Sequence, residues 1–65
     1  MFNRIMLEKE MVGLQLNLSQ LAEKLGMTRE TLRRRMKTGD FTRSEIEKLR
    51  AIFGTEAAEG FLFAK

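Results

Sequence analysis

Residues 17–37 carry the feature that most constrains the fold, which is a pair of short helices separated by a glycine. The stretch reads NLSQLAEKLGMTRETLRRRMK. Asn17 is placed to cap the first helix, with Gln20 three residues on as in a capping box, and Thr28 is placed to cap the second. Gly26 lies between them and permits the positive φ that a sharp turn needs. We therefore expect a helix-turn-helix core here.

Apolar residues at helical spacing predict an all-α fold of five helices. The predicted ranges are 3–12, 18–25, 29–37, 43–53 and 56–64. The chain has no proline, and alternation of the strand type is scarce. The end of the chain, GFLFAK at 60–65, also fits a short strand, so both readings stay open there. With 65 residues, a single domain over 1–65 is expected.

Caps and apolar stripes agree with these ranges along the chain. Asn3, Thr42 and Thr55 are the expected caps of the other helices, and Glu45 completes a second capping box with Thr42. Three apolar pairs stand as hydrophobic staples across the caps: Leu16 with Leu21, Met27 with Leu32, and Phe41 with Ile46. The residues expected to face the core are Ile5, Met6, Met11, Val12, Leu18, Leu21, Ala22, Leu25, Leu32, Met36, Ile46, Leu49, Ile52, Phe53, Ala57, Ala58, Phe61 and Leu62.

Composition excludes several classes of function. The chain has no cysteine and no histidine, so it cannot form a disulfide, a Cys/His zinc site or a catalytic set with a histidine base. No glycine loop of the phosphate-cradling type occurs either. We therefore expect no enzyme activity, no metal and no cofactor. No run of about 18 apolar residues and no signal-peptide pattern occurs, so neither a membrane span nor secretion is expected.

Positive charge is concentrated in one predicted helix. Residues 27–37 hold five basic side chains, of Arg29, Arg33, Arg34, Arg35 and Lys37, against one acid, Glu30. The other residues hold seven basic and eight acidic side chains. A localised basic patch is what a phosphate-binding surface requires.

This pattern resembles the helix-turn-helix of small phage repressor and Cro-type regulators, the lambda-repressor-like class. Ala22, Gly26, Met27 and Leu32 stand at the small, glycine and apolar positions of that motif. The segment GDFTRSEIEKLRAIFGTEAAEGFLFA is similar to the second half of such regulators, in which a glycine-phenylalanine turn leads into a fourth helix and an aromatic helix closes the domain. The resemblance covers roughly residues 3–64. It implies a DNA-binding transcriptional regulator of phage or prophage type, located in the cytoplasm of a bacterial host cell or on its nucleoid.

Two residues depart from the pattern of that class. Arg35 stands where many members carry an apolar residue, so its stem is expected at the edge of the core with the guanidinium outside. Leu18 stands where a polar residue often begins the second helix. A base contact from that position is therefore in doubt, although Asn17, Ser19 and backbone N–H groups can still hold a phosphate.

The resemblance places residues 28–37 in the major groove of double-stranded DNA. Arg29, Arg33 and Arg34 are candidate readers of guanine, and Glu30 can accept from cytosine or orient one of these arginines. Thr31 offers a methyl group to thymine, while Lys37 and Arg35 are expected on phosphates. The residues expected to bind DNA are Asn17, Ser19, Gln20, Thr28, Arg29, Glu30, Thr31, Arg33, Arg34 and Lys37.

Two other functions on the same fold stay open. One is a protein-interaction module of the antitoxin or anti-repressor type, for which the aromatic tail around Phe61–Phe63 is the feature to watch. The other is an architectural or recombination-directionality protein that bends phage DNA, although the wing hairpin that many such proteins use is lacking. The same aromatic tail is the expected seam of a homodimer, which would read two half-sites about 10 bp apart.

Overall fold

The computed structural model describes residues 1–64, and every element in that range is an α-helix. The helices are α1 (Arg4–Gly13), α2 (Leu18–Leu25), α3 (Arg29–Thr38), α4 (Arg43–Phe53) and α5 (Thr55–Leu62). The predicted all-α class with five helices is confirmed. The last segment is helical as far as Leu62, so the strand alternative is wrong there, and Lys65 lies outside the described residues. None of these helices is long and apolar enough to cross a membrane.

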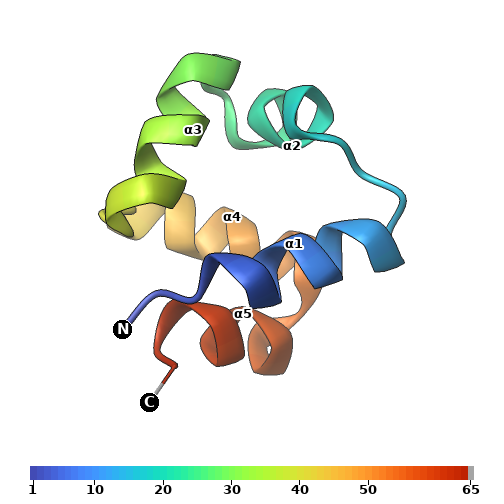
Figure 1. Ribbon diagram of the computed structural model, residues 1–65, viewed down its shortest axis with the longest axis vertical. Helices are drawn as coiled ribbons and strands as arrows, with labels where there is room; N and C mark the ends of the chain where they lie inside the picture. Colours follow the sequence, from blue (N-terminus) through green and yellow to red (C-terminus); the bar gives the residue numbers. More distant parts are fainter. Residues whose placement is uncertain (65) are drawn as a thin grey trace.

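The helices pack in two groups (Figure 1). The first group is α2 with α3, and the second is α5 with α1 and α4 packed on it, while α2 also contacts α4. In Figure 1 α3 stands at the upper left margin of the molecule, and both chain ends lie at the lower left. One long side of α3 is therefore left uncovered by other helices.

Each helix contributes at least one fully buried side chain to a shared core. These are Leu7 of α1, Leu21 of α2, Leu32 of α3, Leu49 of α4 and Phe61 of α5, all with no exposed surface. Burying one such side chain stabilises the fold by about 1.5–3 kcal/mol. The partly buried Leu16, Met27, Phe41 and Ile46 pack against this core, as their predicted staple positions require. The core thus holds α3 by its inner face only.

Four of the five predicted helix caps are present. The side chains that accept a backbone N–H of the first turn are Asn3, Asn17, Thr28 and Thr42, and both predicted capping boxes close through Gln20 and Glu45. The prediction for Thr55 is wrong, because α5 is capped by Gly54 and has no side-chain cap bond. A single residue separates α4 from α5, so the turn at Gly54, with φ of 94°, draws Thr55 into the first turn of α5.

The predicted buried face of α1 is only partly correct. Of the predicted residues only Met11 is buried, whereas Ile5, Met6 and Val12 are 65%, 41% and 76% exposed, and Leu7, which was not predicted, is completely buried. Leu7 and Met11 are four residues apart and form one narrow stripe, and α5 is the main packing partner of α1. The apolar residues that flank this stripe remain in contact with solvent.

Candidate nucleic-acid interface

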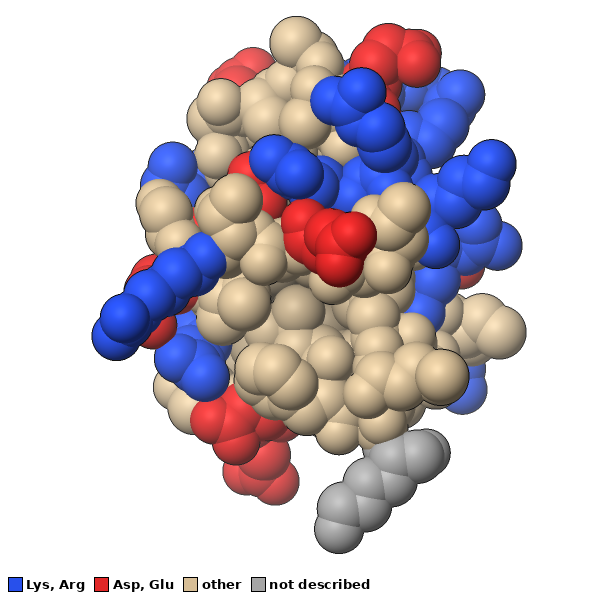
Figure 2. All heavy atoms as spheres, turned by 90° about the vertical axis from the view of Figure 1, so that its left-hand side faces the viewer, with Lys and Arg blue, Asp and Glu red and all other residues tan. Residues whose placement is uncertain are grey.

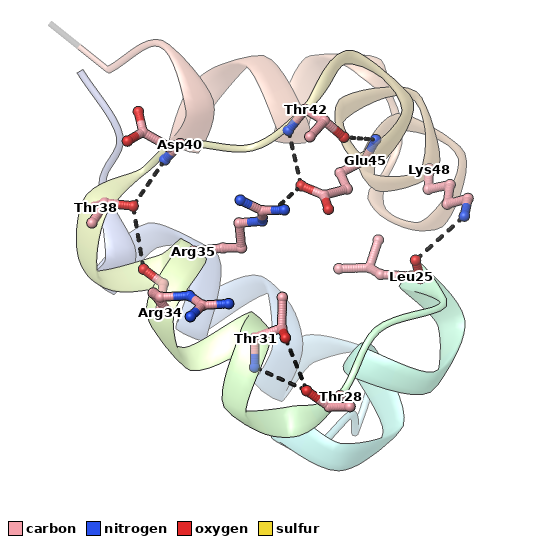
Figure 3. Close-up of polar contacts among 10 residues, drawn as sticks. All are labelled: Leu25, Thr28, Thr31, Arg34, Arg35, Thr38, Asp40, Thr42, Glu45 and Lys48. Carbon is pink, nitrogen blue, oxygen red and sulfur yellow. Dashed lines mark hydrogen bonds and ion pairs between the residues drawn. The ribbon is translucent and has the colours of Figure 1, made fainter.

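The turn between α2 and α3 depends on Gly26. Its φ and ψ are 73° and 30°, in the left-handed region, and its N–H bonds to carbonyls of the last turn of α2. Glycine adopts this conformation without the steric cost that a Cβ imposes. Lys48 of α4 reaches across and donates from Nζ to the carbonyl of Leu25 at 3.3 Å (Figure 3). The turn is thus fixed both by its own backbone and by a side chain from α4.

The helix that follows has an apolar inner face and a basic outer face. Leu32 and Met36 are 0% and 6% exposed, as predicted. The charged residues that the structure leaves exposed are Arg29, Glu30, Arg33, Arg34 and Lys37. Figure 2 views the molecule from the side on which α3 lies, and there lysine and arginine side chains gather at the upper right, above a lower region that is largely uncharged.

The cations on this outer face have no acidic partner in the described part of the chain. Ion pairs within 4.0 Å join Arg35 to Glu45, and Arg50 to Glu47 and Glu59. Glu30 makes none with the arginines one turn along, so the predicted orienting contact is absent from the free protein. Four uncompensated positive charges on one helix create a local potential that attracts polyanions.

Arg35 is held apart from the other arginines. Its Nε lies 3.2 Å from Oε1 of Glu45, with side-chain exposures of 30% and 13%. Figure 3 shows the two side chains directed toward each other from α3 and α4. The N–H of Nε is not aligned for a hydrogen bond, so the contact is an ion pair. The predicted position at the core edge is confirmed, but the guanidinium faces α4 and the predicted phosphate contact is not supported.

The start of α2 meets the start of α3 on one flank of the basic face. Asn17, Leu18, Ser19 and Arg29 line one shallow depression there. Leu18 is half-buried and packs against the core, so the polar groups in this depression come from its neighbours. The structure therefore brings Asn17 and Ser19, at the start of α2, together with Arg29 of α3.

Several predicted polar residues already make hydrogen bonds within the protein. Oδ1 of Asn17 accepts the N–H of Gln20 at 2.8 Å, and Oε1 of Gln20 accepts the N–H of Asn17 at 2.9 Å. Oγ1 of Thr28 accepts the N–H of Thr31 at 3.1 Å and donates to its hydroxyl at 2.9 Å. Because the amide NH2 groups of Asn17 and Gln20 are not used in these caps, they remain as donors.

Two supporting residues were not expected from the sequence. The sequence predicts Glu45 only as a cap residue of α4 and predicts no contact for Lys48, yet each contacts the helix-turn-helix from α4. A carboxylate at the third position of α4 was a signal for a cap. No signal in the sequence indicated that Oε1 of Glu45 also contacts Arg35 of α3, ten positions earlier.

Comparison with known proteins agrees with this geometry. Residues 6–38 match the family model described as bacterial regulatory protein, Fis family. The matched segment contains most of α1, all of α2 and all of α3, and it makes up about half of the chain. No curated protein and no solved structure matches the chain. The predicted helix-turn-helix is confirmed, while the match does not extend to the phage repressor or Cro type. The chain belongs to the bacterial regulatory protein, Fis family, with a helix-turn-helix DNA-binding domain over residues 6–38.

Proposed function

We propose that this protein is a sequence-specific transcriptional regulator whose helix α3 enters the major groove of double-stranded DNA. The observation that carries the proposal is the outer face of α3, where Arg29, Arg33, Arg34 and Lys37 are exposed and form no ion pair within residues 1–64. A helix fits the major groove of B-DNA, and phosphates on both sides of the groove provide the missing negative charge.

The exposed residues of α3 divide by the chemistry they offer. Arg29, Arg33 and Arg34 each carry the forked donor set that binds O6 and N7 of guanine. Glu30 accepts from N4 of cytosine. Lys37, in the last turn of α3, binds a phosphate and adds affinity without sequence information. We assign the reading of base sequence to the exposed arginines together with Glu30.

The residues at the helix starts fix the position of α3 in the groove. Asn17, Ser19 and Gln20 surround the N-terminus of α2, where free N–H groups and side-chain donors favour a phosphate. Thr28 and Thr31 bond to each other, so their role is to hold the first turn of α3, with the methyl group of Thr31 available to thymine. In this proposal residues 1–65 act as one DNA-binding unit around a core at 17–37.

We further propose that the regulator is of the phage or prophage repressor and Cro type. The support is that α4 and α5 follow the helix-turn-helix directly, as the resemblance of residues 39–64 to such regulators implies. A protein of this type acts in the bacterial cytoplasm on operator DNA. It is expected to read paired half-sites about 10 bp apart as a homodimer.

Selection from randomised duplexes, followed by fluorescence titration of the selected and an unrelated duplex, tests the function. A pseudo-palindromic consensus and tighter binding to the selected duplex are expected. Both affinities should fall steeply with salt. Equal affinity for every duplex would contradict sequence-specific regulation, and bending of permuted sites without a consensus would favour the architectural alternative.

One observation favours a second function, a protein-interaction module. Phe63 is 55% exposed directly after α5. If this residue binds a partner protein, Phe63→Asp abolishes that binding while DNA affinity is unchanged. Loss of DNA affinity in the same variant would point instead to a homodimer contact.

A further inference from the structure

The N-terminus of α1 carries a basic residue, Arg4, that lies outside the helix-turn-helix and outside the matched residues 6–38. Its side chain is exposed. Arg4 lines two depressions that border α3, one with Lys37 and Thr38 and the other with Leu18 and Arg33. Arg4 therefore lies beside the row formed by Arg33 and Lys37, which are one helical turn apart.

Packing fixes the start of α1 at this place. The backbone N–H of Asn3 donates to the carbonyl of Phe61 at 2.7 Å. The ring of Phe2 lies 5.3 Å from that of Phe41 and 6.4 Å from that of Phe61. The missing side chain of Gly39, at the end of α3, makes room for Phe2, because a Cβ there would come within 2.7 Å of the Cβ of Phe2. Arg4 is thus held against the end of α3 by the residues that precede it.

The position of Arg4 is electrostatically unfavourable for the free protein. It is the first residue of α1, whose first turn contains no acidic residue. A cation at a helix N-terminus opposes the macrodipole. Arg33 and Lys37 add two like charges nearby. Glu8 lines the depression that Arg4 and Arg33 share, but no carboxylate of residues 1–64 lies within 4.0 Å of the charged nitrogens of these three residues. One carboxylate against three cations leaves a local charge of +2, which a bound polyanion neutralises.

We propose that Arg4 binds a backbone phosphate of the DNA next to the one bound by Lys37, and so extends the DNA interface from the helix-turn-helix onto α1. This inference rests on the proposed function. It adds a contact that positions the protein and contributes affinity without reading bases. The group that Arg4 binds is a phosphodiester, because a guanidinium at the rim of the basic face reaches the DNA backbone before it reaches base edges.

The test compares Arg4→Ala with Lys9→Ala, a change that removes the same charge from an exposed residue of the same helix. Each phosphate contact adds about 0.9 to the slope of log affinity against log salt. Arg4→Ala should therefore reduce the slope by about 0.9, so that the ratio of wild-type to variant affinity rises about eightfold when the salt concentration is lowered tenfold. The loss should be equal for the selected and the unrelated duplex, Arg4→Lys should retain the slope, and Lys9→Ala should match the wild type.

A duplex with single neutral methylphosphonate linkages identifies the phosphate. One linkage should weaken the wild type and leave Arg4→Ala unaffected. If the wild type binds DNA and Arg4→Ala behaves as Lys9→Ala does, the inference is overturned and the proposed function stands. If the wild type binds no duplex, both are overturned. Thermal unfolding separates binding from folding, because Arg4→Ala should unfold at the same temperature as the wild type or slightly above it.

Discussion

The Nε atom of Arg35 in α3 lies 3.2 Å from Oε1 of Glu45 in α4. The same oxygen accepts the backbone N–H of Thr42 at 2.8 Å, so one carboxylate both caps α4 and contacts α3 (Figure 3). Glu45→Ala removes both contacts and should lower the free energy of unfolding by about 1–2 kcal/mol. Glu45→Gln should cost less, because an amide oxygen can still accept the cap bond. Urea unfolding of both variants measures the difference.

The matched control for this prediction is Glu47→Ala in the same helix. Glu47 is 62% exposed and, within residues 1–64, pairs only with Arg50, three residues along, so its loss should change stability by less than about 0.5 kcal/mol. If Glu45→Gln proved as destabilising as Glu45→Ala, the charge on Glu45 would matter more than its cap bond.

Gly39→Ala should be more destabilising than Gly26→Ala. Both glycines have a positive φ, of 78° and 73°, so alanine costs about 1 kcal/mol of backbone strain at either position. At Gly39 the new Cβ also comes within 2.7 Å of the Cβ of Phe2, whereas at Gly26 the nearest atom is Nζ, at the far end of the long Lys48 side chain, at 3.4 Å. Chemical unfolding of the two variants gives both costs on one scale.

A double-mutant cycle isolates the clash at Gly39. Phe2→Gly removes the Cβ that a side chain at Gly39 would meet, but also the packing against Phe41 and Phe61, so it is destabilising alone. If the clash is real, Gly39→Ala should cost less in the Phe2→Gly background than in the wild type. Additive costs would show that Phe2 and Gly39 are not in the contact described.

Local signals predicted α2, α3 and α4 nearly to the residue. Each of these helices begins at a side-chain cap and carries an apolar stripe in phase with it, so sequence neighbours alone determine the element. Gly26 at the turn and the burial of Leu32 and Met36 follow from the same local information. The exposed arginines of α3 follow too, since they occupy the face opposite that stripe.

The ends of the chain were less predictable because their structure depends on distant partners. Along α1 the apolar residues Ile5, Met6, Leu7, Met11 and Val12 fit more than one face, and only the packing of α5 selects Leu7 and Met11. Helix α1 ends at Gly13, and the positive φ that follows falls on Gln15, two residues later. For the candidate site, no local pattern indicated that Arg35 turns to Glu45.

Arg33→Ala and Arg34→Ala should each weaken DNA binding at one base position. If either arginine binds guanine, its loss should cost about 1–3 kcal/mol on the selected duplex and nearly nothing after that base pair is changed. Lys37→Ala should weaken all duplexes about equally, because a phosphate contact carries no sequence information. Titration of each variant against single-base variants of the site measures both effects. A uniform loss for both arginine variants would assign them to phosphates.

Phe63→Asp should prevent formation of the homodimer without unfolding the domain. Phe63 is 55% exposed, whereas Phe61, in the same predicted dimer seam, is completely buried by its own chain and packs edge-on against Phe53 at 5.5 Å between ring centroids. Phe61→Ala should therefore cost about 3–5 kcal/mol and leave so small a domain largely unfolded, as circular dichroism will show. Phe63→Asp should retain the helical spectrum and melting temperature.

If Phe63 forms the dimer contact, sedimentation equilibrium of this variant should show a monomer at concentrations at which the wild type is dimeric. Its affinity for a duplex with two half-sites should fall toward that for a single half-site. A wild type that remains monomeric both free and on the two-half-site duplex would remove the dimer from the proposed mechanism, and the exposed ring of Phe63 would then be available only to a different protein.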